Sequence, residues 1–190
     1  VSNLDKKPGS QHPYAPFITS TLQQEGIRKL RMSSQQVMRV AQRLYENGYI
    51  TYMRTDSVHL SQEAINASRN AITSMYGENY LPSSPRVYKS KAKNAQEAHE
   101  AIRPAGSTFK HPNEIKNVVD VAEYNLYDLI WKRTVASQMA SAKIQKTTVK
   151  ISDGTHIFTS HGKIIEFPGF LRAYVEGADD PSKQLDDKEK

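Results

Sequence analysis

Apolar residues recur with a helical period through most of the first 140 residues, most clearly between Ser33 and Gly48. There they stand at i, i+3, i+4 and i+7, the spacing that places side chains on one face of an α-helix. Ser33 is followed three residues later by Gln36, the pattern of a capping box in which each side chain satisfies a free main-chain N–H. The segment therefore predicts an amphipathic helix that ends at Asn47-Gly48. Its apolar positions are Val37, Val40, Ala41 and Leu44.

Four other segments carry helical signals. Residues 19–30 and 61–76 have helical periodicity, with Ser61 as a cap, and the longest helical stretch lies within residues 120–139. A second capping-box pattern, Asn94-Ala-Gln-Glu97, predicts a short helix. This helix should end at Pro104, because proline lacks the N–H that continues a helix.

Near the C-terminal end the pattern changes to alternation, which is typical of β-strands. Residues 146–151 and 155–160 alternate on either side of Asp153-Gly154, a strong hairpin signal, and residues 163–175 continue as β-like chain. A hairpin without further strands is only marginally stable. We therefore expect these strands to belong to a larger sheet whose remainder is missing from this chain.

The remaining segments have neither period. Residues 1–16 are rich in Pro, Gly, Ser and Asn and are predicted to be an irregular connector, and residues 81–93 are predicted to be a loop. The short β-rich segment Tyr49–Thr55 is predicted to be extended. Together the patterns predict an α+β fold, mainly helical to residue 140 and β-structured over residues 141–175.

Composition narrows the class of protein. The 190 residues suffice for a domain with a real core. The absence of cysteine excludes disulfides and thiolate metal ligands. No apolar run approaches the ~18–20 residues that span a bilayer, and no signal segment opens the sequence. We therefore expect a soluble, intracellular chain, and the absence of an initiator Met leads us to expect a piece of a longer polypeptide.

The charge is unevenly distributed. The chain has 26 Lys and Arg against 20 Asp and Glu, a net charge of +6. Residues 176–190 hold six acids and three lysines, so this predicted linker carries −3 and the first 175 residues carry +9. Basic residues concentrate in Leu22–Arg54 and Arg86–Lys93, which indicates a surface that follows phosphates. A solvated face that keeps the protein soluble is the alternative, and charge alone does not decide between them.

A Tyr-x-Arg pair stands in the predicted extended segment. Residues two apart on a strand share a face, so Tyr52 and Arg54 should point the same way. A phenol is a poor nucleophile near neutral pH because its ordinary pKa is ~10, but a neighbouring guanidinium favours the phenolate. A guanidinium can also stabilise charge on a phosphoryl transition state. The pair suits attack on a phosphodiester, although a Tyr-x-Arg pair on its own is usually an ordinary surface pair.

A second polar cluster lies in the predicted short helix. His99 and Arg103 are four residues apart, so a helix would place them on one face. Glu97 and Glu100 make a metal site conceivable, but the spacing is not that of a His-Glu-x-x-His site, which disfavours it. The basic surroundings favour a His/Arg pair that faces a phosphate or the tyrosine, and a solvated helix with internal Glu–Arg support is the alternative.

Two predicted helices in tandem, the second of them basic, also match a helix-turn-helix pattern. This allows a different function, in which the chain is a non-catalytic module that binds duplex DNA through the major groove. A protein-interaction domain with incidental charge is a third possibility.

Four blocks of sequence, in order and separation, resemble the bacterial type IA DNA topoisomerases of the topoisomerase I branch. A weaker likeness continues through Leu129–Arg133 and the strands that follow, so the resemblance covers nearly the whole chain. The four blocks are Pro16–Gln24 (PFITSTLQQ), Ala41–Glu46 (AQRLYE), Gly48–Ser57 (GYITYMRTDS) and Gln96–Pro104 (QEAHEAIRP).

This resemblance implies the roles of individual residues. Tyr52 matches the tyrosine that attacks a phosphodiester of single-stranded DNA and becomes joined to the 5′ phosphate, which makes the reaction reversible without ATP. Arg54 matches the arginine that positions and stabilises this phosphate. His99 matches a histidine associated with DNA contacts and assembly of the active site. The remaining residues expected near the tyrosine or the DNA are Gln42, Arg43, Glu46, Thr51, Thr55, Asp56 and Arg103.

The resemblance also implies a domain plan. Residues 1–15 would be a connector from a β-rich arch domain, residues 16–138 a mainly helical, catabolite-activator-like (winged-helix-related) domain with the tyrosine, residues 139–176 return strands of the arch, and residues 177–190 an acidic tail. The Mg²⁺-binding acids of the family lie in a toprim domain that this sequence lacks. We therefore expect Mg²⁺ ligands outside this chain, partners consisting of DNA and the other domains of the same polypeptide, a cytoplasmic, nucleoid-associated setting, and no DNA relaxation by this segment alone.

Overall fold

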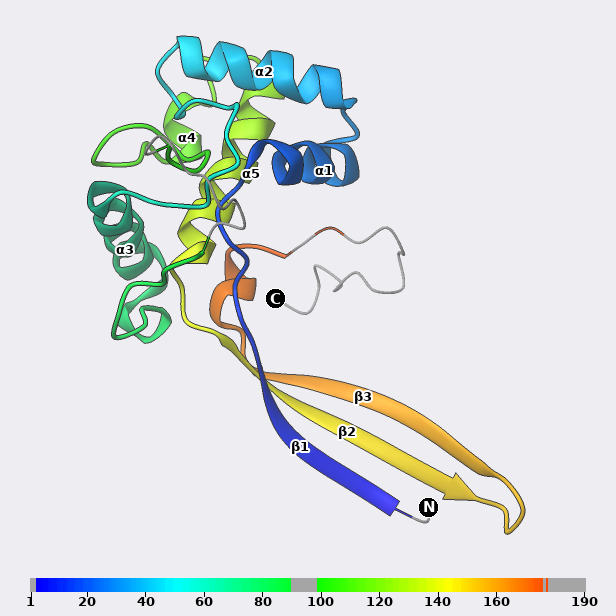
Figure 1. Ribbon diagram of the computed structural model, residues 1–190. Helices are drawn as coiled ribbons and strands as arrows, with labels where there is room; N and C mark the ends of the chain where they lie inside the picture. Colours follow the sequence, from blue (N-terminus) through cyan, green and yellow to red (C-terminus); the bar gives the residue numbers. More distant parts are fainter. Residues whose placement is uncertain (1–2, 90–98, 176, 178–190) are drawn as a thin grey trace.

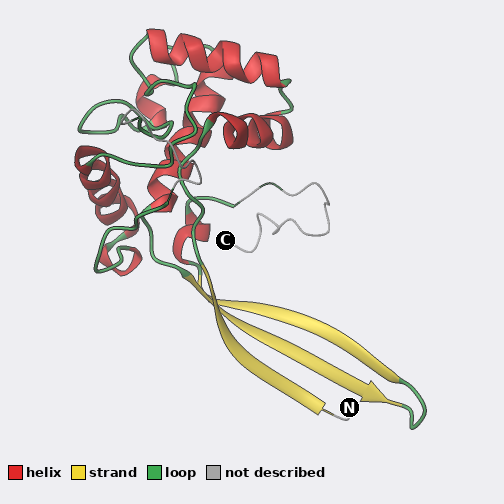
Figure 2. Ribbon diagram, viewed as in Figure 1, coloured by secondary structure: helices red, strands yellow, loops and turns green. Residues whose placement is uncertain are grey.

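The computed structural model describes residues 3–89, 99–175 and 177. Within them, the helices form one body from which a three-stranded antiparallel sheet extends as an arm (Figures 1 and 2). None of the described helices is long and apolar enough to cross a membrane. In chain order the elements are β1 (Asn3–Gln11), α1 (Thr19–Leu30), α2 (Ser34–Glu46), α3 (Gln62–Tyr76), η1 (Glu78–Tyr80), α4 (Pro112–Ile115), α5 (Val121–Ser137), β2 (Ala142–Ser152), β3 (Ile157–Phe167) and η2 (Gly169–Arg172).

The four longer helices begin where the sequence predicts. The α1 helix starts at Thr19, and the capping box before α2 is formed, with Ser33 and Gln36 each accepting from the other's main-chain N–H. Ser61 caps α3, and Asp120 caps α5 by accepting from the N–H of Glu123. These helices are therefore confirmed. The short α4 and η1 are not predicted by the sequence patterns.

Helix α5 lies at the centre of the helical body, where α1, α2, α3 and α4 all contact it (Figure 1). Eleven of its 17 residues are buried, so it has no polar face of ordinary width. Leu126, Ile130 and Val135 are fully enclosed. The burial of this helix on most sides supplies the core against which the other helices are fixed.

Helices α1 and α2 approach each other closely at a glycine. A Cβ atom added to Gly26 of α1 would lie 2.5 Å from a methyl carbon of Val37 in α2. No real Cβ makes so short a contact, so the crossing requires the absence of a side chain at this position. Val37 is itself fully buried and cannot swing into solvent.

The arm corrects the prediction for the N-terminal segment. The sequence predicts an irregular connector over residues 1–16, but Asn3–Gln11 form β1, which pairs antiparallel with β2 from Asn3 opposite Lys150 to Gln11 opposite Ala142. The strand is polar and mostly exposed on both faces, so its side chains leave no alternating signal. Its pairing depends on the main chain, and as an edge strand it tolerates Pro8.

The predicted hairpin is confirmed, with β2 and β3 joined through the turn at Asp153-Gly154. Asp153 stabilises this turn by accepting from the N–H groups of Thr155 and His156. The sequence predicts that the hairpin belongs to a larger sheet, and β1 supplies one further strand of that sheet by pairing with β2. The β-like stretch predicted over residues 163–175 is wrong after Phe167, where the chain forms η2.

The short helix predicted between residues 94 and 104 is also wrong in its described part. Asn94-Ala-Gln-Glu97 lies outside the described residues, and residues 99–103 are not helical. The main chain there is used in cross-chain bonds: Ala101 N–H donates to the His59 carbonyl at 2.8 Å and Ile102 N–H to the Phe17 carbonyl at 2.9 Å. Such partners cannot coexist with i to i−4 helical bonds.

A buried arginine joins the arm to the helical body. Arg133 of α5 is 3 % exposed, and its Nε donates to the Ala15 carbonyl at 2.6 Å, where the chain enters from β1. Its Nη1 donates to the Tyr174 hydroxyl at 3.3 Å, after the chain has left β3. That hydroxyl donates to Glu25 Oε2 at 2.5 Å. One connected network thus fixes two of the segments that join the sheet to the helical body, the one after β1 and the one after β3.

The close crossing of α1 and α2 predicts the effect of Gly26→Ala. Alanine gains up to about 1 kcal/mol of helix propensity. The overpacking against Val37 costs about 1–3 kcal/mol, so we expect a net loss of unfolding free energy. Denaturant unfolding of the chain measures this loss, and in a Val37→Ala background the same change should cost less. A Gly26→Ala chain as stable as the original would contradict the packing described here.

Candidate functional site

The Tyr52 segment lies between α2 and α3, alongside residues 101–105. Thr51 N–H donates to the Arg103 carbonyl and Ala105 N–H to the Tyr49 carbonyl, both at 2.9 Å. Ile50 and Pro104 form an isolated antiparallel bridge. The segment is thus short extended chain with bends, held to its neighbour by a few bonds and not part of a sheet. This brings together the two blocks of sequence singled out for their chemistry.

Burial alternates along this segment. Met53 and Thr55 are 4 % and 9 % exposed, whereas Tyr52, Arg54 and Asp56 are exposed. Tyr52 and Arg54 therefore share exposure to solvent, as expected of residues two apart on an extended chain, and their common direction stays a prediction. Arg54 makes no hydrogen bond or ion pair with the described part of the chain. The phenol and the guanidinium are therefore both presented to solvent.

Helix α2 places an aromatic side chain against the phenol ring of Tyr52. The Tyr45 ring meets the Tyr52 ring edge to face, with centroids 5.3 Å apart and planes at 67°. Gln42 and Glu46 lie one turn apart on α2, and both are exposed. Gln42 Nε2 donates a hydrogen bond of 2.8 Å to Glu46 Oε1. Tyr45 is not among the predicted site residues, although its place within the AQRLYE block was a usable signal.

The two threonines beside Tyr52 hold main-chain groups. Thr51 Oγ1 donates to the Ala101 carbonyl at 2.7 Å and accepts from Arg103 N–H at 3.0 Å. Thr55 N–H donates to Thr19 Oγ1 at 2.9 Å, and Thr55 Oγ1 accepts from Ser57 N–H at 3.1 Å. These contacts fix the backbone on both sides of the phenol. Thr19 is a further residue of the site that the sequence predictions omitted.

Arg103 is buried and its donors are bound by the chain, whereas the sequence predicts it on a helix, on one face with His99. It is 6 % exposed, its Nη2 lies 2.7 Å from Glu100 Oε2, and its Nη1 donates to the Pro104 carbonyl at 2.9 Å. Ser61 N–H also donates to Glu100 Oε1 at 2.7 Å. Burial acts to raise the pKa of Glu100, but the hydrogen bonds from Arg103 and Ser61 outweigh it, so this pKa lies below its ordinary value.

His99 begins the described part of this segment with an exposed side chain. It lies two residues before Ala101, and the Ala101 carbonyl accepts a hydrogen bond from Thr51. The segment of His99 is thus held next to the segment of Tyr52 without forming a helix. The predicted helical pairing of His99 with Arg103 is therefore absent. Arg103 pairs with Glu100 and stabilises the loop.

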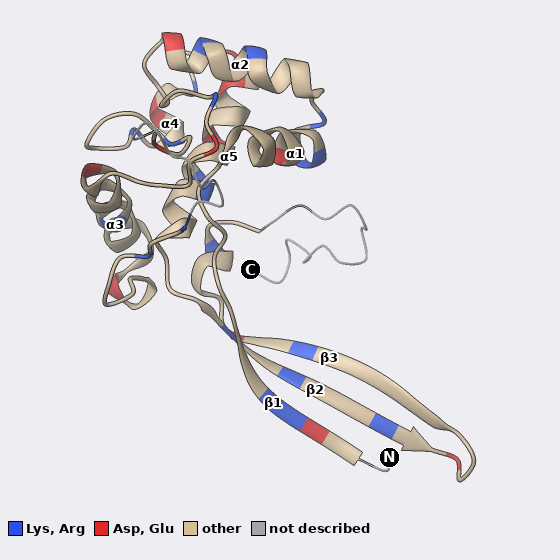
Figure 3. Ribbon diagram, viewed as in Figure 1, with Lys and Arg blue, Asp and Glu red and all other residues tan. Residues whose placement is uncertain are grey.

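The basic residues of the predicted phosphate track divide into two groups. Arg43 pairs with Asp120 at 2.7 Å and Glu123 at 3.2 Å, at the start of α5. Lys29 lies over the Tyr174 ring and donates to the Val175 carbonyl. Four residues, Arg31, Arg39, Arg54 and Lys89, are exposed and have no ion pair to the described chain, while Lys91 and Lys93 lie outside the described residues. Figure 3 shows further Lys and Arg on all three strands of the arm.

The described residues offer no group of three His, Asp or Glu side chains that could hold a metal ion. Two acidic residues near the predicted site already have side-chain partners: Glu100 pairs with Arg103, and Glu46 accepts a hydrogen bond from Gln42. The described residues therefore do not fit a Mg²⁺ site.

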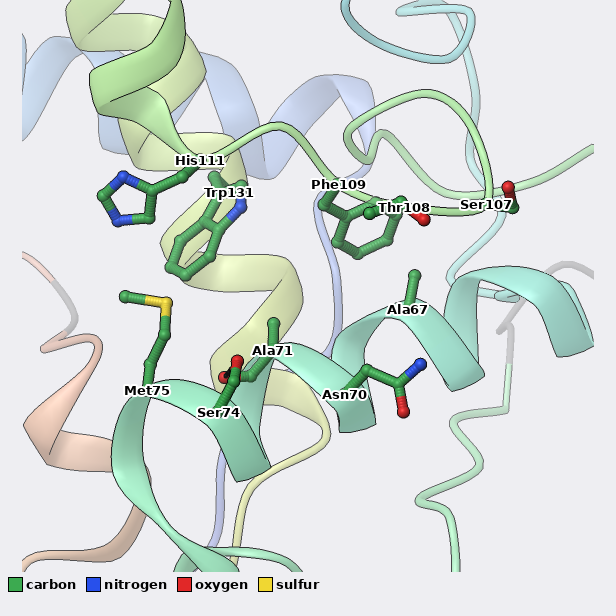
Figure 4. Close-up of a pocket in the computed structure, with 10 residues that line it drawn as sticks. All are labelled: Ala67, Asn70, Ala71, Ser74, Met75, Ser107, Thr108, Phe109, His111 and Trp131. Carbon is green, nitrogen blue, oxygen red and sulfur yellow. Dashed lines mark hydrogen bonds between the residues drawn. The ribbon is translucent and has the colours of Figure 1, made fainter.

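A pocket of about 460 Å³ lies away from these residues, between α3 and the loop before α4 (Figure 4). Its walls are largely apolar, with Met75, Phe109 and Trp131 around it. None of the predicted site residues lines it, so the pocket is separate from the Tyr52 segment.

The chain matches known proteins along its whole length. The family model described as DNA topoisomerase matches residues 1–190. DNA topoisomerase 1 of Synechococcus elongatus is 58 % identical over 189 residues, which cover 100 % of this chain and 21 % of that protein. DNA topoisomerase 1 of Streptomyces coelicolor is 56 % identical over 195 residues, covering 100 % of this chain and 20 % of that protein.

A solved structure of the same family also resembles this chain. Full-length topoisomerase I from Thermotoga maritima matches with a TM-score of 0.77 and 34 % identity, over 94 % of this chain and 30 % of that one. The chain spans about a fifth of the length of the curated relatives it matches. With a family match over all 190 residues and more than half of them identical in two relatives, this chain belongs to the bacterial DNA topoisomerase family.

Proposed function

We propose that this chain is the tyrosine-bearing part of a type IA DNA topoisomerase I, with Tyr52 as its nucleophile. One observation carries the proposal: Tyr52 and Arg54 are both exposed on a segment whose main chain is fixed on either side, in a chain of this family. The complete polypeptide would relax negatively supercoiled DNA by cutting and rejoining one strand.

The proposed step is an exchange of phosphodiester partners. Tyr52 Oη attacks the phosphorus of a single-stranded DNA linkage, a new O–P bond forms, and the bond from phosphorus to the 3′ oxygen breaks. The phenol loses its proton and the departing 3′ oxygen gains one, so the products are a 5′-phosphotyrosine and a free 3′-OH. Because the phosphodiester energy is retained, the 3′-OH reverses the step without ATP.

Arg54 would act on the charge of the reacting phosphate. A guanidinium presents several N–H donors in a plane and binds phosphate oxygens in pairs. Its exposed position two residues from Tyr52 suits contact with the same phosphate group. Stabilising the negative charge that builds up on the phosphoryl oxygens is the role in which such a donor contributes most to rate.

The other predicted residues would serve this step in two ways. Gln42, Glu46, Asp56 and His99 are exposed, and we assign them to contact with DNA or with the phosphate as it approaches. The polar groups of Thr51, Thr55 and Arg103 are occupied by the chain itself, and we assign them to holding the site in place. Arg43 contributes less net charge to DNA, because two carboxylates pair with it.

The proposal extends to the surroundings of the site. Residues 16–138 would form the winged-helix-related domain, and residues 1–15 and 139–176 would belong to the arch. Mg²⁺ would be bound by acidic residues of a part of the polypeptide outside this chain. That part would also support the departing 3′ oxygen, which is why this chain alone should lack relaxation activity.

A non-catalytic helix-turn-helix module is the second candidate, because α1 and α2 are joined by the short turn at residues 31–33. That function would use the basic face of α2 against duplex DNA. Arg43 on this helix is tied to the start of α5, and the exposed Tyr52 and Arg54 have no part in groove binding. These contacts favour the topoisomerase proposal.

The nucleophile is tested by Tyr52→Phe in the full-length polypeptide. Removal of the hydroxyl removes the attacking atom, so we expect no covalent protein–DNA adduct after denaturation of the reaction, while non-covalent binding of single-stranded DNA is unchanged. Tyr45→Phe is the matched control and should still form adducts. Adducts at the original level in Tyr52→Phe would refute the assignment.

The incompleteness of the segment is tested with the purified 190-residue chain. We expect no relaxation of negatively supercoiled plasmid in the presence of Mg²⁺, whereas the full-length polypeptide relaxes the plasmid in the same assay. Relaxation by the isolated chain that depends on Mg²⁺ would show that the step needs no further domain.

The two candidate functions differ in the DNA they prefer. A gel-shift titration should show the chain binding a single-stranded oligonucleotide at least as tightly as a duplex of equal length, with affinity that falls as salt rises. A clear preference for the duplex would favour the helix-turn-helix module. Binding without any dependence on salt would argue against both DNA functions.

A further inference from the structure

We propose that Thr19 is a positioning residue for the cleavage step, which holds the main chain on both sides of Arg54 and so fixes where Arg54 and Tyr52 meet the phosphate. The inference rests on the proposed function, because it concerns the same site. Thr19 lies 33 residues before Tyr52 in the sequence. It reaches the site because α1 begins beside the Tyr52 segment.

Thr19 makes a dense set of bonds with this segment. Its hydroxyl donates to the Met53 carbonyl at 2.7 Å, lies 3.1 Å from the Thr55 carbonyl, and accepts from Thr55 N–H at 2.9 Å. Its own N–H donates to the Thr55 carbonyl at 2.9 Å. One residue therefore binds both of the residues that flank Arg54.

The place of Thr19 in its helix makes these bonds available. It is the first residue of α1, and the first N–H groups of a helix have no partner within the helix. The N–H of Thr19 finds its acceptor in the Tyr52 segment. A change in the backbone of residues 53–55 would therefore also disturb the start of α1, which couples the site to the packed body.

The bonds matter because the segment has no regular structure of its own. Thr51 fixes one end against residues 101–103, and Thr19 fixes the other end at Met53 and Thr55. Tyr52 and Arg54 lie between these attachments with exposed side chains. Without the Thr19 hydroxyl, the Met53 carbonyl and Thr55 N–H of these buried residues would each need a new partner, and the backbone would have to move to find one.

Movement of this kind reduces the rate without removing any reacting group. Displacement of about 1 Å in a site that depends on orientation can cost about 10²-fold in rate. The expected result for loss of the hydroxyl is therefore slower covalent chemistry with DNA binding unchanged. A hydroxyl at position 19 is what the mechanism needs, so serine should replace threonine and valine should not.

The test compares Thr19→Val and Thr19→Ser in the full-length polypeptide with a control on the same helix turn, Thr21→Val. Thr21 Oγ1 accepts from Ile18 N–H at 3.0 Å, so its loss also weakens the start of α1 without touching residues 53–55. The measurements are the single-turnover rate of adduct formation on a saturating single-stranded oligonucleotide, the dissociation constant for that oligonucleotide, and the thermal unfolding midpoint. Tyr52→Phe runs alongside as the reaction control.

We expect Thr19→Val to form adducts about ten-fold or more slowly with unchanged affinity, Thr19→Ser to recover most of the rate, and Thr21→Val to keep the original rate. A Thr19→Val enzyme at the original rate would overturn the inference while Tyr52→Phe still lacks adducts. Equal rate losses in Thr19→Val and Thr21→Val that follow their thermal midpoints would also overturn it, because they show a structural role only. Adducts in Tyr52→Phe would instead overturn the proposed function.

Discussion

Everything at the candidate site depends on how an irregular stretch of main chain is kept in one conformation. Residues 49–56 belong to no sheet and no helix, yet Met53 and Thr55 are buried, and buried N–H and carbonyl groups must be paired. The pairing comes from residues distant in the sequence, with Arg103 and Ala105 on one side and Thr19 on the other. Exposed Tyr52 and Arg54 are thereby presented by a backbone that has little freedom to move.

The helical body supplies the rigidity behind these bonds. Helix α1, which carries Thr19, crosses α2 at the glycine contact with Val37, and α2 in turn places Tyr45 against the Tyr52 ring. Both helices pack on the buried α5. Arg133 of α5 extends the same framework to the segments that follow β1 and β3. The site, the body and the arm therefore share one continuous set of contacts.

The sequence predicts those parts of the fold that depend on local patterns. The caps at Ser33 and Ser61 and the hairpin at Asp153-Gly154 are local signals, and each is present. The β1 strand is not predictable in this way, because its polar residues pair through the main chain with a segment far along the sequence. For the same reason the local pattern wrongly predicts a helix at residues 99–103, since nothing nearby shows that Phe17 and His59 bind their N–H groups.

In the candidate site, too, local sequence predicts some features, and others depend on tertiary contacts. Alternation within the short segment predicts the common face of Tyr52 and Arg54, whereas the burial of Arg103 and the contact from Thr19 are tertiary and leave no periodic signal. The chemistry proposed for these residues comes from the resemblance of the four sequence blocks, and the family match over the whole chain confirms that resemblance.

The assignment of Tyr52 as the nucleophile is tested most directly by locating the attached nucleotide. The full-length polypeptide is trapped on single-stranded DNA by denaturation, digested with nuclease and protease, and its peptides are mapped by mass spectrometry. Tyr45, Tyr49 and Tyr52 lie close together in the sequence and serve as internal comparisons. We expect one modified residue, Tyr52, joined through its phenolic oxygen to a 5′ phosphate. Modification of Tyr45 or Tyr49, or a linkage to a 3′ phosphate, would contradict it.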